Sequence, residues 1–200
     1  MLKETGIQKN DNKTSRLFNK AISNDFMNIK KMKSSDYVRH CWTLYEEACK
    51  SNPKHSSLSG NIFELIVASE LYRQSLCPMY LQAEVAFVPN VKFDILLYSS
   101  NQFPIGLSLK TSLRERYKQT DLEAVALKYV HRRAKNYLIT LDHDEAERTK
   151  NKAEKGDLLG INRIIIANNN DFDELIEELS DMTFITPEPV DIVKGNVINK

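Results

Sequence analysis

Three apolar runs in the middle of the chain constrain its fold more than any other feature. They cover residues 81–88, 91–98 and 105–110, and Pro89-Asn90 and residues 99–104 separate them. Short runs rich in β-forming residues and divided by turn residues predict a three-stranded β-meander. Helices elsewhere in the chain are then expected to cover it.

Helical spacing of apolar residues precedes the meander and alternates with strands after it. Before the meander, we expect one helix from Asp36 to Asn52 and a second from about residue 57 to 75. After it we expect helix, strand, helix, strand and helix, at residues 122–135, 137–141, 142–155, 163–167 and 171–179. Pro187 and Pro189 mark an irregular tail. This order predicts an α/β protein with a central mixed β-sheet flanked by helices.

The predicted helix at residues 122–135 is amphipathic. Its apolar face, expected to pack on the sheet, contains Leu122, Val125, Ala126, Tyr129 and Val130. The two strands that follow it are almost wholly apolar, which is typical of strands covered on both faces.

The composition favours one compact domain. The chain has 200 residues, 42% of them hydrophobic, and no linker rich in Gly, Pro or Ser divides it. We expect an N-terminal helical arm or subdomain at residues 1–56, only partly ordered at its start, and a single catalytic domain at residues 57–200. The net charge is only +1, but residues 105–135 are basic and residues 141–181 acidic. A local basic face is typical of a DNA enzyme, although unlike faces also merely keep proteins soluble.

Cysteine spacing and hydropathy indicate the cellular location of the protein. Cys41, Cys49 and Cys77 lack the spacing of a disulfide framework or a zinc site. No signal-peptide pattern and no apolar run of membrane-spanning length is present. We therefore expect a soluble, cytoplasmic protein of prokaryotic type without a membrane partner.

Two charged residues stand at the predicted ends of neighbouring strands. Asp94 is the only acidic residue in its apolar run, and Lys110 ends the next run. A carboxylate inside a sheet is costly without a metal or ion partner, and an ammonium beside it can contact a phosphate and orient water. Asp94 could instead pair with Lys92, and a Lys at a strand end is commonly just solvated. Mg²⁺ prefers carboxylate oxygens, so Glu64 and Glu123 are further candidate ligands.

An Asp followed by a strand that carries (Asp/Glu)-x-Lys resembles the signature of the PD-(D/E)XK nucleases. Here Ser108 takes the first position of the tripeptide, and Phe93 replaces the Pro. The pattern is similar to that of the type II restriction endonucleases that recognise CCGG, CCNGG or CCWGG sites, typified by EcoRII, SsoII and PspGI. In that group Ser-x-Lys is accompanied by a Glu displaced onto the following helix, and Glu123, thirteen residues after Lys110, matches it. The resemblance covers about residues 60–123.

This resemblance implies a restriction-endonuclease-like core and a set of site residues. Asp94 and Glu123 are expected to hold Mg²⁺, Glu64 to assist directly or through water, and Lys110 to contact the phosphate. Glu70, on the same predicted helix, competes with Glu64 for its position. Water would attack in line and leave 5′-phosphate and 3′-hydroxyl ends. A palindromic DNA site implies a homodimer, and a monomer that nicks each strand in turn is the alternative.

The triplet Arg114-Glu115-Arg116 matches an Arg-(Asp/Glu)-Arg triplet of the same group. Arg donates two hydrogen bonds to guanine O6 and N7, and a carboxylate accepts one from cytosine N4, so recognition of G·C pairs is expected. Taken alone, the triplet is more simply an exposed salt-bridge cluster. Arg39 and Trp42 could stack extruded bases, as in some relatives, although a Trp on an amphipathic helix is more ordinarily a core residue.

Two other functions stay open at this point. A structure-selective repair nuclease or junction resolvase would share the core and lack base specificity. A DNA-binding module that no longer cuts is the other, and the serine at position 108 motivates it.

Overall fold

The computed structural model describes residues 1–188, and this part of the chain contains six α-helices, two short 3-10 helices and five strands. In chain order they are α1 Lys13–Ala21, η1 Phe26–Asn28, α2 Ser34–Ser51, η2 Pro53–Leu58, α3 Ser59–Arg73, β1 Met79–Ala83, β2 Phe93–Ser99, β3 Phe103–Lys110, α4 Arg116–Val130, β4 Lys135–Thr140, α5 His143–Glu154, β5 Arg163–Ile166 and α6 Asn170–Ser180.

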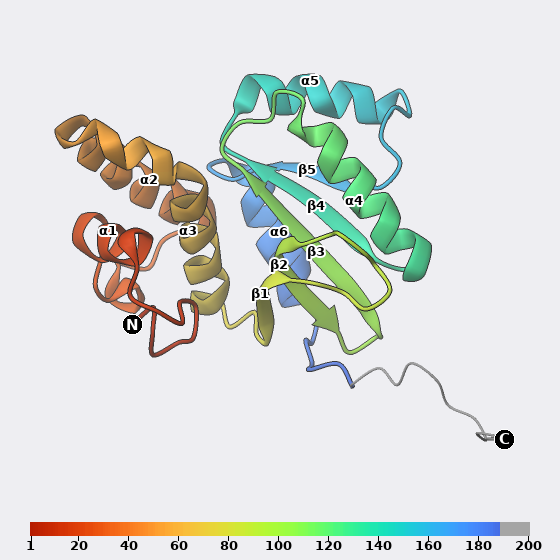
Figure 1. Cartoon of the computed structure of the whole chain (residues 1–200), viewed down its shortest axis with the longest axis horizontal. Coiled ribbons are helices and arrows are strands. Elements are labelled where there is room, and N and C mark those ends of the chain that lie inside the picture. The colour runs from red at the N-terminus through yellow and green to blue at the C-terminus, as the bar shows by residue number, and fades with distance from the viewer. Residues whose placement is uncertain (189–200) are drawn as a thin grey trace, which may run out of the picture.

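A single five-stranded sheet, in the order β1-β2-β3-β4-β5, forms the centre of the molecule (Figure 1). The pairs β1–β2 and β2–β3 are antiparallel, whereas β3–β4 and β4–β5 are parallel. Parallel neighbours need long crossover connections, and α4 and α5 lie within the two that occur here. The prediction of a mixed sheet flanked by helices is confirmed.

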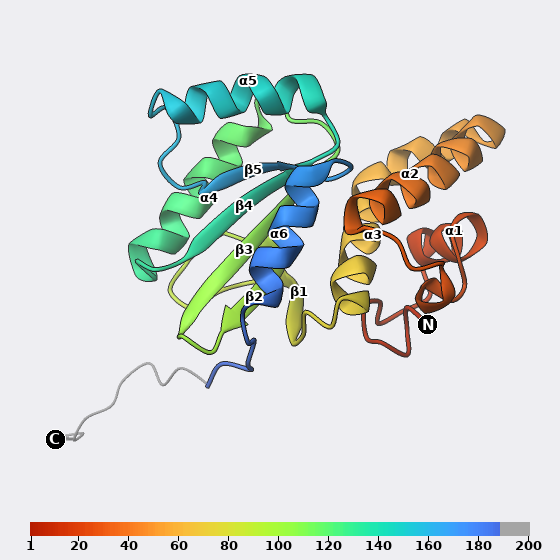
Figure 2. The same ribbon diagram turned by 180° about the vertical axis from the view of Figure 1, so that it is seen from behind.

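Helices cover both faces of the sheet. Viewed from behind, α6 crosses one face, and α4 and α5 lie on the other (Figures 1 and 2). Successive residues of a strand point to opposite faces, so Ile139 of β4 belongs to the same buried cluster as Leu175 of α6, and Leu138 to the same cluster as Ala146 of α5. Leu138 and Ile139, which are adjacent in β4 and point to opposite faces of the sheet, are both fully buried. Burial on both faces explains the almost wholly apolar sequence of this strand.

The N-terminal helices gather beside the sheet around α3. Helix α3 contacts α1 and α2, and it also contacts β3. Its length matches the predicted helix at residues 57–75 to within two residues at each end. Helix α3 packs both on the N-terminal helices and on the sheet. The predicted domain boundary at residue 56 stays a prediction.

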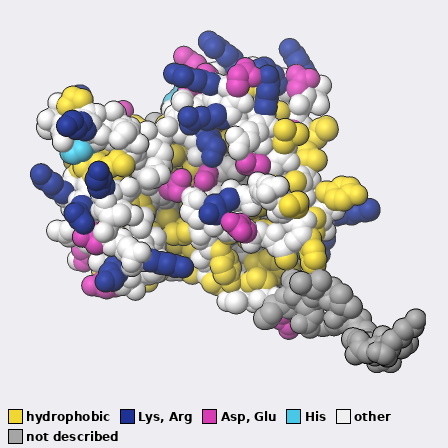
Figure 3. All heavy atoms as spheres, in the orientation of Figure 1, with side chains coloured by type: hydrophobic (Ala, Val, Ile, Leu, Met, Phe, Trp, Pro, Cys, Tyr) yellow, Lys and Arg dark blue, Asp and Glu magenta, His cyan; other side chains and the backbone are white. Residues whose placement is uncertain are grey.

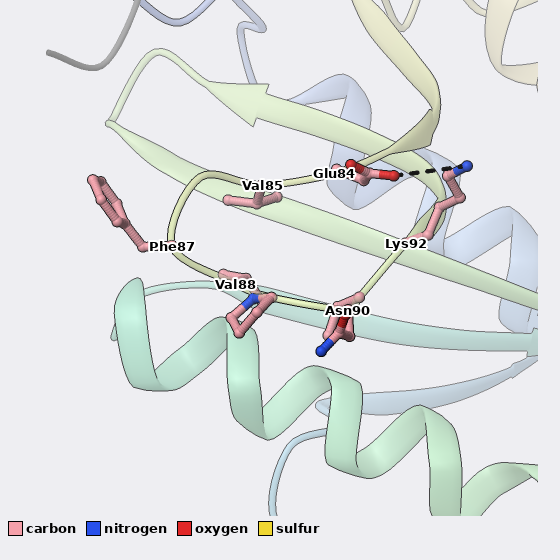
Figure 4. Close-up of a pocket in the computed structure, with 8 residues that line it drawn as sticks. Glu84, Val85, Phe87, Val88, Asn90 and Lys92 are labelled. Atoms are coloured by element: carbon pink, nitrogen blue, oxygen red, sulfur yellow. Dashed lines mark ion pairs between the residues drawn. The ribbon is translucent and has the colours of Figure 1, made fainter. Parts of the chain in front are cut away.

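The first predicted strand is partly wrong. Strand β1 ends at Ala83, and residues 84–92 form a loop instead of continuing the strand to residue 88. In this loop Val88 and Val91 are buried in a cluster with Leu127 of α4, so their apolar character reflects packing against a helix. Figure 4 shows the loop running past α4, with Phe87 pointing away from it.

The predicted apolar face of α4 is also wrong. Leu122 and Tyr129 are 70% and 88% exposed, and Val130 is 37% exposed. The helix begins six residues earlier than predicted and buries its opposite side, which includes Asp121. The Asp121 carboxylate accepts hydrogen bonds from three backbone N–H groups in the segment before β5, at 2.8 to 3.1 Å. Apolar side chains are visible along α4 in the space-filling view (Figure 3).

The last described residues follow helix α6. Pro187 is exposed and lies beyond the last helix, and Pro189 lies outside the described residues. Within residues 1–188, no helix is both long enough and apolar enough to cross a membrane.

Candidate active site

Asp94 and Lys110 meet at one end of the sheet. Strands β2 and β3 are antiparallel, so the start of β2 lies beside the end of β3. Lys110 Nζ donates to Asp94 Oδ2 at 3.1 Å, and the same oxygen accepts the backbone N–H of Leu109 at 2.7 Å. The side chains of Asp94 and Lys110 are 14% and 26% exposed, so the pair is partly buried and still open to a substrate.

Glu64 lies beside this pair, on α3. Glu64 and Asp94 both line a groove of about 1240 Å³ that β1 and N-terminal residues such as Lys9 also border. Burial first and the charge of Asp94 second raise the pKa of Glu64 to about 7, while a hydrogen bond from Gln82 and the charge of Lys110 act in the opposite direction. The two carboxylates are therefore close enough to repel each other. Figure 3 shows acidic side chains on this face, between α3 and the strands.

Glu70, the other candidate on α3, lies in the interior. It is fully buried, accepts hydrogen bonds from Ser34 Oγ and Gln74 Nε2 at 2.7 Å each, and pairs with Arg73 at 3.1 Å. This network links α2 to α3, and the charge of Glu70 is paired with Arg73 inside the fold. Between the two candidates, only Glu64 lines the groove.

Gln82 is a groove residue that the sequence analysis did not single out. Its Nε2 donates to Glu64 Oε2 at 2.8 Å, across a separation of eighteen residues. The sequence signal for Gln82 is weak, because the predicted strand at residues 81–88 contains a second polar residue, Glu84. It became informative only when β1 was placed next to β2, opposite Asp94.

Glu123 is not among the residues that line the groove. It is half-buried on α4, and its Oε1 accepts a hydrogen bond from Gln119 Nε2 at 2.8 Å. Among the described residues, no three His, Cys, Asp or Glu side chains gather closely enough to hold a metal ion. Ser108 is 6% exposed in β3 and offers no carboxylate. The role of Glu123 as a displaced metal ligand therefore stays a prediction.

The donor set of the groove fits a hard divalent cation that keeps most of its water. Asp94 Oδ1 and Glu64 Oε1 accept no hydrogen bond from any described residue, whereas the second oxygen of each carboxylate is engaged. Mg²⁺ commonly binds through one or two carboxylates together with water and substrate phosphate. Two carboxylates with one free oxygen each match that pattern.

The triplet Arg114-Glu115-Arg116 lies at the exposed start of α4. The backbone N–H of Arg114, which has a φ of +42°, donates to the Glu145 carboxylate on α5. Glu115 forms an ion pair with Lys118, which lowers the pKa of Glu115. The guanidinium groups of Arg114 and Arg116 have no ion-pair or hydrogen-bond partner within residues 1–188, so both are available to an external acceptor.

Arg39 and Trp42 lie on α2, and both side chains have internal partners. Arg39 donates to Asp36 at 2.5 Å and to the backbone carbonyl of Asn168 at 2.6 Å. The Trp42 ring lies 4.9 Å from the Tyr45 ring and 6.0 Å from the Phe63 ring, between centroids. Trp42 serves packing in this structure, and a role in stacking bases stays a prediction.

Comparison with known proteins gives two similar solved structures. No protein-family model and no curated protein matches the chain. The restriction endonuclease PspGI in complex with its substrate DNA is similar with a TM-score of 0.48 and 16% identity, over 91% of this chain and 79% of that chain. Metal-depleted Ecl18kI in complex with uncleaved, modified DNA is similar with a TM-score of 0.44 and 22% identity, over 84% of this chain. The chain spans 62% of the length of the Ecl18kI chain.

Proposed function

We propose that this protein is a type II restriction endonuclease that requires Mg²⁺. It would cut double-stranded DNA at a palindrome containing CC/GG, of the CCGG, CCNGG or CCWGG type, and leave 5′-phosphate ends. The observation that carries the proposal is the contact between Asp94 and Lys110 at the sheet end, together with Glu64, which lines the same groove as Asp94. These are the residues that the resemblance to the PD-(D/E)XK enzymes selects.

Asp94 and Glu64 would hold the cation through the oxygens that accept no other hydrogen bond. When bound, Mg²⁺ neutralises charge on a phosphate and lowers the pKa of a bound water. Glu123 is proposed as an additional ligand on the resemblance alone. Separate substitution of Glu64 and Glu123 would show which carboxylate the cation requires.

Lys110 would bind the scissile phosphate. Its ammonium lies on a partly buried side chain and is directed by Asp94, so it is held in place before the substrate arrives. A hydrogen bond from Nζ to a non-bridging phosphate oxygen would stabilise charge that develops as water attacks.

The exposed Arg114 and Arg116 would recognise guanine in the major groove, and Glu115 would accept from cytosine N4. On binding DNA, the Glu115 carboxylate would give up its ion pair with Lys118 and accept a hydrogen bond from the base instead. A homodimer would apply the same residues to both halves of a palindrome, because a two-fold protein matches a two-fold DNA site.

The test is digestion of DNA of known sequence in the presence of Mg²⁺, followed by mapping of the ends. We expect defined fragments from the parent and none from Lys110→Ala. Lys135→Ala is the matched control, because Lys135 also stands at a strand end, is partly buried and forms an ion pair, with Glu178 at 2.7 Å. Cutting of branched DNA without sequence preference would instead indicate a repair nuclease or resolvase. Specific binding without any cleavage would indicate an inactive DNA-binding module.

A further inference from the structure

Gln82 occupies a constrained position in β1. The neighbouring residues Leu81 and Ala83 pair with Ile95 and Phe93 of β2, so Gln82 lies opposite Asp94. Its φ is +52°, in the left-handed region that side chains other than glycine rarely adopt. Strain of this kind costs about 1 to 3 kcal/mol and is found most often where a site requires it.

The amide of Gln82 is the only side-chain or backbone donor, within residues 1–188, that forms a hydrogen bond with the Glu64 carboxylate. A glutamate side chain has three rotatable bonds and loses considerable freedom when it is fixed. The contact therefore restricts Glu64 before any cation binds. It also occupies Oε2 and leaves Oε1 without a hydrogen bond from any described residue.

We propose that Gln82 is a positioning residue of the cation site, which orients Glu64 toward a divalent cation shared with Asp94. This inference rests on the proposed function and adds to it a residue that acts through Glu64. Partners that orient a metal ligand commonly change metal affinity by about 10- to 100-fold when they are removed.

The competing explanation is that Gln82 only ties β1 to α3. In that case its loss would lower the stability of the fold and would leave cation affinity unchanged. The two explanations also differ in their dependence on Glu64, because a residue that acts through Glu64 has no effect on the cation once Glu64 is absent.

The experiment measures Mn²⁺ binding to the full-length protein without DNA, by calorimetry. Gln82→Met removes the amide and keeps the length of the side chain. Asn170→Ala is the matched control, because it removes an amide that donates to a Glu carboxylate, Glu174, at the same 2.8 Å outside the groove. We expect Gln82→Met to weaken Mn²⁺ binding about 10-fold and Asn170→Ala to leave it unchanged. In a Glu64→Ala background, Gln82→Met should cause no further loss.

Three results would overturn the inference: a parent protein that binds no Mn²⁺, an unchanged affinity in Gln82→Met, or an equal loss with and without Glu64. If Gln82→Met does not fold, Gln82→Gly replaces it, because glycine adopts a positive φ without strain. Cleavage is scored separately. A protein that shows the coupling between Gln82 and Glu64 and cuts no DNA would refute the proposed nuclease and leave this inference standing.

Discussion

Replacing Glu64 by Gln should stabilise the apo protein at high pH while it weakens cation binding. The folded protein raises the pKa of this carboxyl from its ordinary value of 4.5 to about 7, through burial first and the charge of Asp94 second. The unfolded chain ionises it near 4.5. Between these two pH values the folded state holds a proton that the unfolded state has released, so stability falls as pH rises.

The size of this effect follows from the pKa difference. A rise from 4.5 to about 7, at about 1.36 kcal/mol per pH unit, corresponds to about 3 kcal/mol at most. Water reaches the carboxylate from the open groove and screens its charge, so about 1 to 2 kcal/mol is the expected gain of Glu64→Gln above pH 7. The gain should shrink through the range from pH 7 to 4.5 and vanish below it.

The assay is urea unfolding of the parent and Glu64→Gln, with a chelator, at pH 4.5, 6 and 8.5. Adding Mg²⁺ at pH 8.5 should then stabilise the parent more than the variant, because binding to the folded state adds stability. For the pH dependence measured in chelator, Glu123→Gln is the matched control, since it removes a carboxylate that accepts a hydrogen bond from a Gln amide at the same 2.8 Å on a different helix. A gain that does not change with pH, or a variant less stable than the parent at pH 8.5, would refute the argument.

Three further predictions concern cleavage, recognition and packing. Asp94→Ala should abolish cleavage and retain sequence-specific binding in Ca²⁺, as measured by gel shift; loss of both would argue against a purely catalytic role. Arg114→Ala should weaken binding to cognate DNA by roughly 1 to 3 kcal/mol, and equal affinity of variant and parent would reject the recognition role. Gly160→Ala should cost about 3 kcal/mol in thermal or urea unfolding, because its Cβ would lie 2.5 Å from the Asp121 carbonyl oxygen and the Val125 nitrogen. A fully stable variant would contradict this contact.

Local sequence patterns predicted most elements because their signals are local. Apolar periodicity and the residues Asn52-Pro53 located α2, and short apolar runs located β2 to β5 to within a few residues. The face of α4 was not predictable in this way, since α4 carries apolar residues on more than one side. The buried side was decided by Asp121, whose partners are backbone groups 38 to 40 residues further along the chain.

Part of the candidate site was likewise predictable from the sequence, and part only from the tertiary structure. The sequence alone determined that Asp94 and Lys110 end neighbouring strands, because alternating runs with a short connection leave few arrangements. Only the tertiary structure decided that Glu64 faces the groove while Glu70 is buried with Arg73, and that Gln82 reaches Glu64. These contacts join α3, β1 and β2 across sequence separations that no local pattern encodes. Their geometry depends on how the helices pack against the edge of the finished sheet.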